Sequence, residues 1–431
     1  MTASSSVLNK YFRCPIDGGA EKRRNVMEKL KLGVIGVGAR GGYLVDLFLT
    51  MDNVLVTAVC DVCGDRVEDN VGKVEKACGQ KPFGTTDYRE IAAKKACDAV
   101  VISTGWEDHV PISICFMEAG IPVGLEVGGA YSVDDCFKLV KCYEKTRTPF
   151  MFLENCCYGR TELMVLNMVQ QGVLGDIVHA GGGYMHDLRT EVLFGRENRH
   201  YRLNNYINRN CHNYPTHDLG PIGVILDFNY GNRPVYLTSI SSKAAGLNAY
   251  AKEHPEVNPE FKDLAFKQGD VVVTNIMCAN GATVTLKLDT TLPRPYSRGF
   301  TIQGTKGMYQ EDGNYVFIDG KYPEELHWNW SPEWNNATKY AEEYDHPIWK
   351  RFLNEGVRGG HGGMDYLIYN EFFEDVLKGK PFPLDVYDAA ILMAITPLSE
   401  TSIANGSAPV EIPDFTGGAW KTKKGSAERF A

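Results

Sequence analysis

The sequence predicts an α/β protein with two parts. The first is a doubly wound parallel sheet, and the second is an α+β domain with a large, mainly antiparallel open sheet. Up to residue 154, short apolar strands alternate with amphipathic helices, and longer runs of alternating apolar and polar residues follow. With 431 residues the chain is long enough for two domains, which we place at 27–154 and 155–431, after a loose N-terminal extension over 1–26.

The first strand and helix are joined by a glycine-rich turn. An apolar run over 32–37 leads into Gly36-Val37-Gly38-Ala39-Arg40-Gly41, after which apolar residues recur at helical spacing. Gly36 permits the tight turn, Gly38 lets the backbone approach a pyrophosphate, and Gly41 permits close helix packing. Asp61 closes the next β-branched run, 20 residues after Gly41, where a carboxylate accepts hydrogen bonds from an adenosine ribose. The pattern predicts a Rossmann unit.

The same residues indicate which dinucleotide binds. A carboxylate at Asp61 repels a 2′-phosphate and so favours NAD over NADP, although Arg40 in the loop would soften that preference. Ligands bind beyond the carboxyl ends of parallel strands, which here are the loops 104–109, 126–129 and 154–155. The candidate cofactor contacts in these loops are Trp106, His109, Glu126, Val127 and Asn155. The alternative interpretation is that Glu126 and Glu154 are ordinary acids at the ends of strands, with no role in binding.

The remaining elements follow in order. In the first part we expect a helix over 67–78, a strand over 99–103, a helix over 110–119, a strand over 122–127, a helix over 133–140 and a strand over 150–153. In the second part we expect a helix over 161–171, strands over 177–186, 235–243, 271–279, 283–288 and 300–310, and helices over 364–377 and 386–403. Asn280-Gly281 predicts a type I′ hairpin. The aromatic tract over 327–349 either walls a sugar site or packs internally.

Charge and cysteine usage exclude several classes of protein. The net charge of −9 offers no general field for nucleic acid or anionic lipid, and no run reaches the roughly 20 apolar residues of a membrane span. The 12 cysteines are scattered, as in a reduced cytoplasmic protein. Cys60 and Cys63 have no second pair at zinc spacing, so we expect no metal. Residues 1–26 lack the apolar core of a secretory signal.

Residues that can transfer protons gather in three segments of the second part, 183–187, 213–218 and 294–296. Tyr184 and His186 are two apart on a predicted strand and therefore point to the same face. Histidine titrates near neutrality, and tyrosine serves as an acid or base when a neighbouring cation lowers its pKa. These segments are the candidate catalytic site.

At these residues the sequence resembles the NAD-dependent glycosidase family of α-N-acetylgalactosaminidases, within the glucose-fructose oxidoreductase and inositol dehydrogenase superfamily. The likeness runs from about residue 30 to 420. It is carried by the segments Gly36–Gly42, Glu154-Asn155, Tyr158–Arg160, Gly182–Arg189, Asn208–Asn210, Tyr214–His217, Gly220-Pro221, Arg294–Tyr296, Gly360–Asp365 and Phe382–Asp388.

The resemblance implies hydrolysis by transient oxidation. NAD takes a hydride from C3 of the sugar, a base removes the acidified C2 proton, the C1 substituent leaves, water adds, and the hydride returns. The resemblance implies catalytic roles for Glu154, Tyr184, His217 and Tyr296. It also implies substrate contacts for Tyr214 and Thr216, and cofactor contacts for Asn155, His186 and Tyr201. Asp218 and Arg202 are further candidate substrate contacts. Which of His217 and Tyr184 handles the C3 hydroxyl and which the C2 proton stays open.

The sequence departs from the family pattern at several points. Asp218 stands where the family has glycine, which would place a carboxylate beside the sugar. Glu126-Val127-Gly128 replaces the superfamily's Glu-Lys-Pro, and loss of that lysine favours a glycosidase over a simple dehydrogenase. The export signal common in the family is missing.

Three functions are compatible with this sequence. The first is an NAD-dependent glycosidase, the second a sugar or cyclitol dehydrogenase that releases NADH stoichiometrically, and the third a silent sensor that oxidises nothing. In each case the partner is a small glycoside or sugar. A homo-oligomer is expected from the open sheet, by analogy with other such domains.

Overall fold

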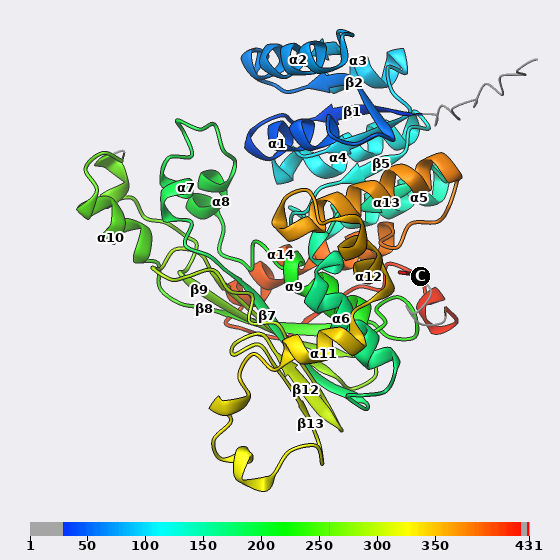
Figure 1. The fold of residues 1–431 in the computed structure, drawn as a ribbon. Helices are drawn as coiled ribbons and strands as arrows, with labels where there is room; N and C mark the ends of the chain where they lie inside the picture. The colour runs from blue at the N-terminus through cyan, green and yellow to red at the C-terminus, as the bar shows by residue number, and fades with distance from the viewer. Residues whose placement is uncertain (1–28, 258, 424–428, 431) are drawn as a thin grey trace, which may run out of the picture.

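The structure is a computed structural model that describes residues 29–257, 259–423 and 429–430. The extension predicted over 1–26 lies outside the described residues. Two sheets make up the molecule, a parallel sheet formed early in the chain and a larger sheet formed later, with helices between and around them (Figure 1). This arrangement confirms the predicted fold class.

The parallel sheet has six strands in the order β3-β2-β1-β4-β5-β6, and all of its pairs are parallel. The strands are β1 (Leu30–Ile35), β2 (Val54–Cys60), β3 (Phe83–Thr85), β4 (Ala99–Ile102), β5 (Val123–Leu125) and β6 (Phe150–Phe152). They are short apolar runs because helices bury both faces of such a sheet. Strand order reverses between β1 and β4, so the ligand crevice opens at their carboxyl ends.

Five helices alternate with these strands: α1 (Ala39–Phe48), α2 (Gly64–Cys78), α3 (Tyr88–Lys94), α4 (Trp106–Glu118) and α5 (Val133–Thr146). The sequence reading missed β3 and α3, since Phe-Gly-Thr is too short to show any periodicity. The helix predicted over 110–119 also begins earlier than expected, at Trp106. Glu107 and Asp108 stabilise the first turn of α4 from Trp106 onward, so residues 106–109 belong to a helix and not to a loop.

Two helices from the end of the chain join the parallel sheet to the rest of the molecule. Tyr369 and Phe373 of α13 (Met364–Lys378) pack edge-on against Phe48 of α1, with ring centroids 4.9 and 5.2 Å away. Helix α14 (Val386–Ala404) contacts α5, β6 and the second sheet. The residues after 154 therefore supply part of the helical cover of the first sheet.

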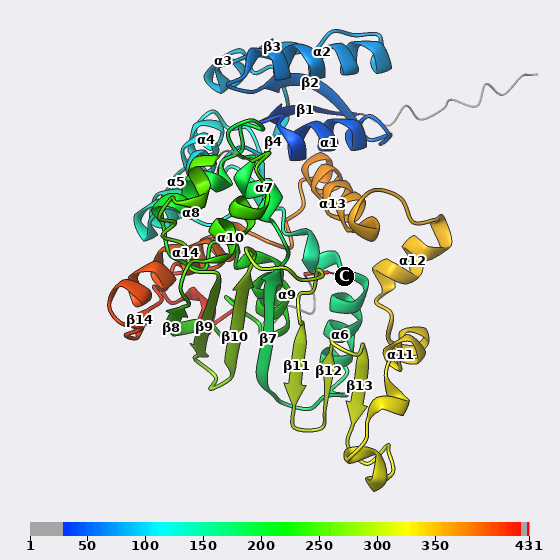
Figure 2. The same ribbon diagram turned by 90° about the vertical axis from the view of Figure 1, so that its left-hand side faces the viewer.

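The second sheet has eight strands in the order β13-β12-β11-β7-β10-β9-β8-β14, seen side by side in Figure 2. The strands are β7 (Ile177–Met185), β8 (Pro234–Ser241), β9 (Val271–Cys278), β10 (Thr283–Asp289), β11 (Thr301–Gly304), β12 (Gly307–Gln310), β13 (Tyr315–Ile318) and β14 (Val410–Glu411). Only the β10–β7 pair is parallel. The sheet is thus mainly antiparallel, as predicted.

Two local predictions for this sheet are wrong. The run over 300–310 is a hairpin of β11 and β12 instead of one strand, because the chain turns between Gly304 and Gly307. The Asn280-Gly281 turn is not type I′, which needs positive φ at both central residues. Only Gly281 has positive φ, at 90°, and its N–H donates to the carbonyl of Cys278, which makes a longer turn closed by a glycine.

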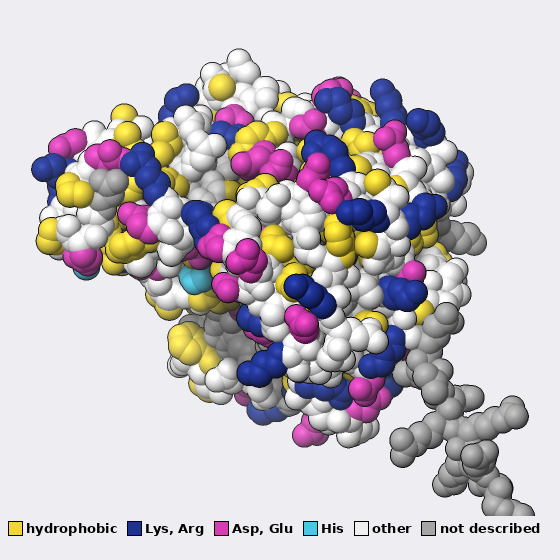
Figure 3. All heavy atoms as spheres, turned by 90° about the horizontal axis from the view of Figure 1, so that it is seen from above, with side chains coloured by type: hydrophobic (Ala, Val, Ile, Leu, Met, Phe, Trp, Pro, Cys, Tyr) yellow, Lys and Arg dark blue, Asp and Glu magenta, His cyan; other side chains and the backbone are white. Residues whose placement is uncertain are grey.

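Helices cover one face of the eight-stranded sheet, among them α6 (Arg160–Gln170), α9 (Thr216–Ile225) and α14. The opposite face leaves Val178 and Ile240 more than half exposed in the single chain. The remaining helices are α7 (Arg189–Leu193), α8 (Arg202–Asn208), α10 (Gly246–Glu253), α11 (Ala337–Tyr344) and α12 (Pro347–Glu355). No helix among the described residues has the length and apolarity to cross a bilayer. Over the face seen in Figure 3, basic and acidic side chains are interspersed.

Candidate active site

The glycine loop leaves the start of α1 open to an anion. Gly36 has φ of 83°, and a side chain at Gly41 would place Cβ 1.8 Å from the Gly36 carbonyl oxygen. The first turn of α1 has no acidic residue and its N-cap, Gly38, offers no capping side chain, whereas α2, α3, α4 and α5 all have acids there. Unpaired N–H groups with no competing carboxylate fit a pyrophosphate.

Asp61 lies beside this loop, at the end of β2. Its carboxylate accepts hydrogen bonds from the backbone N–H groups of Val37 and Cys63, both at 2.9 Å. These bonds hold the strand end against the glycine turn and leave carboxylate lone pairs for a ribose hydroxyl. Arg66, which the sequence analysis did not select, has Nη1 3.9 Å from Asp61 Oδ2 and 3.2 Å from a Cβ placed on Gly38. Its place on a polar helix surface gives no signal in the sequence.

Arg40 does not serve as expected beside the ribose. Its guanidinium donates to Glu126 at 2.8 Å and to both carboxylate oxygens of Asp365 at 3.0 Å. Tyr369 donates a short hydrogen bond to Glu126 as well. Arg40 is therefore committed to two carboxylates and does not favour NADP, and Glu126 is more than an ordinary strand-end acid.

The first turn of α13 and the short turn before it contribute two residues that sequence reasoning left without a role. Asp365 is fully buried and accepts from Asn155 Nδ2 at 2.9 Å, and His361 Nδ1 lies 2.7 Å from it. The hydrogen bonds from His361 and Arg40 keep the pKa of Asp365 far below its usual value in spite of burial. This carboxylate positions Asn155, whose Oδ1 makes no hydrogen bond to the described residues and is free for a ligand.

Aromatic side chains form the wall between the crevice and the second sheet. Trp106 packs on Tyr201 and Tyr214, with ring centroids 4.7 and 5.8 Å away. A Cβ on Gly128 would lie 2.3 Å from the Trp106 ring, so the Glu126-Val127-Gly128 turn fits under the indole because residue 128 is glycine. His109 is buried within α4 and lies 3.1 Å from the Thr104 carbonyl, and burial lowers its pKa to about 4. It is a neutral residue that fixes the loop before α4.

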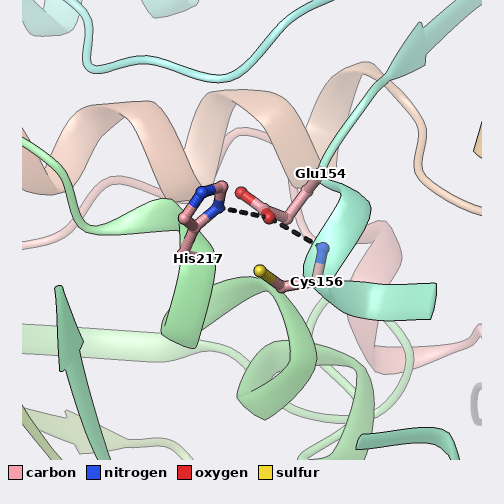
Figure 4. A group of neighbouring side chains, drawn as sticks. All are labelled: Glu154, Cys156 and His217. Carbon is pink, nitrogen blue, oxygen red and sulfur yellow. Dashed lines mark hydrogen bonds and ion pairs between the residues drawn. The ribbon is translucent and has the colours of Figure 1, made fainter. Parts of the chain in front are cut away.

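A buried carboxylate and a histidine form the centre of the site. Glu154 follows β6 and His217 lies in the first turn of α9, and Nδ1 of His217 lies 2.7 Å from Oε1 of Glu154 (Figure 4). The other ring nitrogen lies 3.3 Å from the Tyr214 hydroxyl. Burial alone would raise the pKa of Glu154, but the charge and hydrogen bond of His217 hold it below its usual value. The carboxylate therefore orients the imidazole. Neighbouring Thr216 is fully buried.

A second pair lies at the end of β7, facing this centre, with Tyr184 inside the strand and His186 directly after it. The hydroxyl of Tyr184 lies 3.1 Å from His186 Nδ1, which confirms that the two side chains share one face. The Tyr184 ring packs 4.3 Å from Tyr214 and 5.6 Å from His217, and Tyr296 lies 6.3 Å from it with half its surface exposed. Burial raises the pKa of Tyr184, and the positive charge of Arg202 opposes that rise.

Arg202 is the cation of this cluster. It is almost fully buried at the start of α8, its guanidinium lies 5.0 Å from the Tyr214 ring and 5.3 Å from the Trp106 ring, and Nε lies 2.7 Å from Glu191. Nη1 makes no hydrogen bond among the described residues. A buried guanidinium N–H without a partner is costly, so it points to an oxygen-rich ligand.

Asp218 lies next to His217 in sequence but belongs to a different environment. It is buried between α9 and β7, where a Cβ on Gly182 would lie 2.7 Å from it, and its Oδ1 makes no hydrogen bond among the described residues. The charges that act on it are those of Arg298, Glu311 and Glu162, of which Arg298 and Glu162 form a buried ion pair. The tract over 327–349 also differs from a sugar wall. Trp349 is buried, helix α11 within this tract contacts α6 and β13, and Trp328 is exposed to solvent. The loop before α11, yellow in Figure 1, lies at the far end of the larger sheet.

We expect Asp218→Asn to stabilise the protein at neutral pH by about 1–3 kcal/mol, the usual cost of a buried unsatisfied polar group. Burial raises the pKa of Asp218 well above its ordinary value, so the folded chain holds this proton more tightly than the unfolded chain. The stability from this proton is complete below the unfolded pKa of about 3.9 and declines as pH rises through the folded pKa. Urea unfolding of both proteins across pH 4–8 measures it. Equal pH dependence in the two would contradict the assignment.

A loop between α7 and α8 closes over the first domain. Arg199 donates two hydrogen bonds to Asp65 at the start of α2, at 2.8 and 2.9 Å, and Arg66 donates to the Asn198 carbonyl at 2.8 Å. The loop rises from the larger sheet toward α1 in Figure 1. It leads directly into Tyr201, so the contacts to α2 hold an aromatic wall of the crevice in place.

We expect Arg199→Ala to speed release of bound NAD by about two- to fivefold, the scale of one exposed ion pair, with little effect on thermal stability. Arg196→Ala is the matched control, because Arg196 pairs with Glu260 in the second domain and not with α2. Both rates are measured by trapping released NAD with an auxiliary dehydrogenase. Equal rates in the two variants would mean that the loop does not retain the cofactor.

Comparison with known proteins places this site in a family. A fold with a parallel sheet, a glycine loop and an acid after β2 defines an enzyme with a dinucleotide-binding domain. The model described as "Oxidoreductase family, NAD-binding Rossmann fold" matches residues 30–153, and the model described as "Glycosyl hydrolase 109, C-terminal domain" matches residues 158–422. The chain belongs to glycosyl hydrolase family 109, which confirms the resemblance, and its cofactor is NAD.

Curated relatives and solved structures agree. A glycosyl hydrolase family 109 protein of Stenotrophomonas maltophilia is 38% identical over 92% of this chain and 91% of its own length. An alpha-N-acetylgalactosaminidase of Tannerella forsythia is 36% identical over 91% and 87%. The myo-inositol 2-dehydrogenase of Lactobacillus plantarum superposes with a TM-score of 0.62 over 90% of this chain and all of that one. At 16% identity it shows the fold alone.

Proposed function

We propose that this enzyme hydrolyses α-linked N-acetylgalactosamine or a related hexosamine by oxidation, elimination and re-reduction. The observation that carries the proposal is the chain Glu154–His217–Tyr214, at 2.7 and 3.3 Å, facing Tyr184 at the carboxyl edge of the NAD-binding sheet. A family relative with that activity in its name supports the choice of sugar.

NAD, when bound, supplies the oxidation of the sugar C3 hydroxyl to a ketone and the later return of the same hydride. Gly36, Gly38 and Asp61 would hold its adenosine and pyrophosphate, and Asn155 would hold its other half. The uncapped, acid-free N-terminus of α1 and the unpaired Asn155 oxygen fit this group. The redox change cancels over one turnover, so the net reaction consumes only water.

The chain's own residues move the protons. A C3 ketone acidifies the C2 proton. When the base removes that proton, the electron pair of the C2–H bond forms a C1–C2 double bond, and the C1–O bond breaks so that the leaving oxygen departs with its electron pair. His217 suits a general base because Glu154 accepts a hydrogen bond from Nδ1–H, which leaves Nε2 with a lone pair facing Tyr214. Tyr184 suits the second transfer, since His186 lies within hydrogen-bonding distance of its hydroxyl and Arg202 stabilises its phenolate. Either residue can serve C2, and the other then serves the C3 hydroxyl.

Arg202 and Tyr296 hold the sugar in this proposal. The unpaired Nη1 of Arg202 donates to a sugar or acetamido oxygen, and a buried cation strengthens the binding of an enolate. Tyr296 is half exposed beside Tyr184 and His186 and lies at the rim of the site, where the leaving group departs.

The test uses an aryl α-N-acetylgalactosaminide in D₂O. We expect release of phenol without net NADH, and deuterium at C2 of the product, because the C2 proton exchanges with solvent during elimination. Stoichiometric NADH with intact aglycone would instead establish a sugar dehydrogenase. Phenol release with no deuterium at C2 would establish direct hydrolysis and overturn the elimination. No turnover of any glycoside or polyol would favour a sensor.

A further inference from the structure

Three possible metal ligands meet at the base of the site. An oxygen of Glu154, the sulfur of Cys156 and a ring nitrogen of His217 all lie within 4.8 Å of one another. Figure 4 shows the thiol and the carboxylate on the same side of the imidazole. Cys156 is brought there by the short 3₁₀ helix Asn155–Tyr158, whose N-cap is Glu154 itself. Nothing in the spacing of these residues in the sequence predicts the cluster.

The local backbone fixes two of the three ligands to each other. The side chain of Glu154 accepts a hydrogen bond from the N–H of Cys156 at 3.1 Å, so the carboxylate and thiol come from one rigid turn. His217 reaches them from α9 through its 2.7 Å contact with Glu154. All three are in a water-poor interior, since Glu154 and Cys156 are buried and His217 is mostly covered.

A second observation points to a ligand here. The other carboxylate oxygen of Glu154, Oε2, is buried and makes no hydrogen bond of ordinary geometry among the described residues, although the neighbouring Thr216 hydroxyl interacts with this carboxylate. An unpaired carboxylate oxygen inside a protein is costly, and a cation satisfies it. The carboxylate that lies beside the thiol and the imidazole thus keeps one oxygen without an ordinary hydrogen bond.

The donor set selects the metal. One sulfur, one imidazole nitrogen and one carboxylate oxygen suit Zn²⁺ or Cd²⁺, whereas Mg²⁺ and Ca²⁺ prefer oxygen ligands alone. Zinc bonds of about 2.0–2.3 Å place its ligand atoms roughly 3.3–3.8 Å apart, so the cluster needs only small side-chain movements. Three protein ligands leave a fourth position for water.

We propose that Glu154, Cys156 and His217 form an inhibitory site for a thiophilic divalent cation such as zinc. Binding displaces the thiol proton to solvent and moves the imidazole proton from Nδ1 to Nε2, while no electron is transferred. The metal then occupies both groups that, in the proposed function, make His217 a base. The inhibition rests on that function, but the binding does not.

The test measures binding and activity separately. Calorimetric titration of the NAD-loaded enzyme with ZnCl₂ is expected to show one tight site per chain, and Cys156→Ser is expected to weaken it by more than tenfold. Cys157→Ser is the matched control, because Cys157 is equally buried on the same turn but lies outside the cluster. Titration with Cd²⁺ adds a second readout, the ultraviolet absorption of a cadmium–thiolate bond, which Cys156→Ser removes.

The second part of the test measures turnover in the presence of zinc. Zinc should abolish turnover of the native enzyme and of Cys157→Ser, a chelator should restore it, and Cys156→Ser should stay active in the same zinc concentration. Equal zinc affinity in the native enzyme and Cys156→Ser would overturn the site. Cys156-dependent binding that leaves turnover unchanged would overturn the inhibition. Binding in an enzyme that hydrolyses no glycoside would support the metal site and count against the proposed function alone.

Discussion

Replacing His217 with alanine is expected to lower kcat by about 10²- to 10⁴-fold, the usual loss when a general acid or base is removed. NAD binding should stay nearly intact, because the residues assigned to its pyrophosphate lie on the other side of the crevice, around the first turn of α1. Steady-state kinetics on an aryl glycoside measures the first effect, and the absorbance of the bound cofactor measures the second.

His254→Ala is the control for this variant. That histidine ends α10 and contacts Glu256 on the surface, away from the site, so its loss should leave kcat unchanged. Activity of His217→Ala within about tenfold of the native enzyme would mean that another group performs the proton transfer.

Glu154→Gln is expected to lower kcat almost as much as His217→Ala does, by on the order of 10²-fold or more, although the amide has nearly the same shape as the carboxylate. The amide cannot stabilise the imidazolium that forms when His217 takes a proton, and it can present an N–H where Nδ1–H needs an acceptor. KM should change less than kcat, because the amide still fills the same volume.

The same variant has a defined effect on acid stability. The folded-state pKa of Glu154 lies below its usual value, so this carboxylate stabilises the fold above its unfolded pKa of about 4.3, and the contribution is lost as pH falls through the folded pKa. Glu154→Gln should therefore be less stable than the native enzyme at neutral pH, and its stability should decrease less than that of the native enzyme when the pH is lowered. Urea midpoints at several pH values below 7 measure this, and parallel curves would contradict it.

The fold was predictable where the periodicity is strong. The strand, glycine turn and helix at the start of the chain and the long alternating strands of the larger sheet are all present. Prediction failed for β3, which has three residues, and at 300–310, where a two-stranded hairpin keeps the same alternation as one long strand. Periodicity also says nothing about α13, whose apolar residues fit a helix but do not reveal that it packs on the first sheet.

The residues of the site were predictable from the sequence, but most of the hydrogen bonds between them were not. Tyr184 and His186 share a strand face, so their hydrogen bond follows from a period of two. The Glu154–His217 pair joins residues 63 apart, and no local pattern specifies it. Asp365 accepts hydrogen bonds from Arg40 and Asn155, but the only sign of its importance in the sequence was its place in the family segment His-Gly-Gly-Met-Asp.

The position of α13 bears on how this chain folds during synthesis. Phe372 fills the space over Gly124 in β5, and Asn370 pairs with Asn53 beside β2, so the parallel sheet is not fully covered until residues near 370 have been made. A ribosome adding about 5–20 residues per second needs at least ten seconds more after completing β6. During that interval the nascent first domain exposes an apolar surface, and a fragment ending at residue 154 will bind chaperones or aggregate.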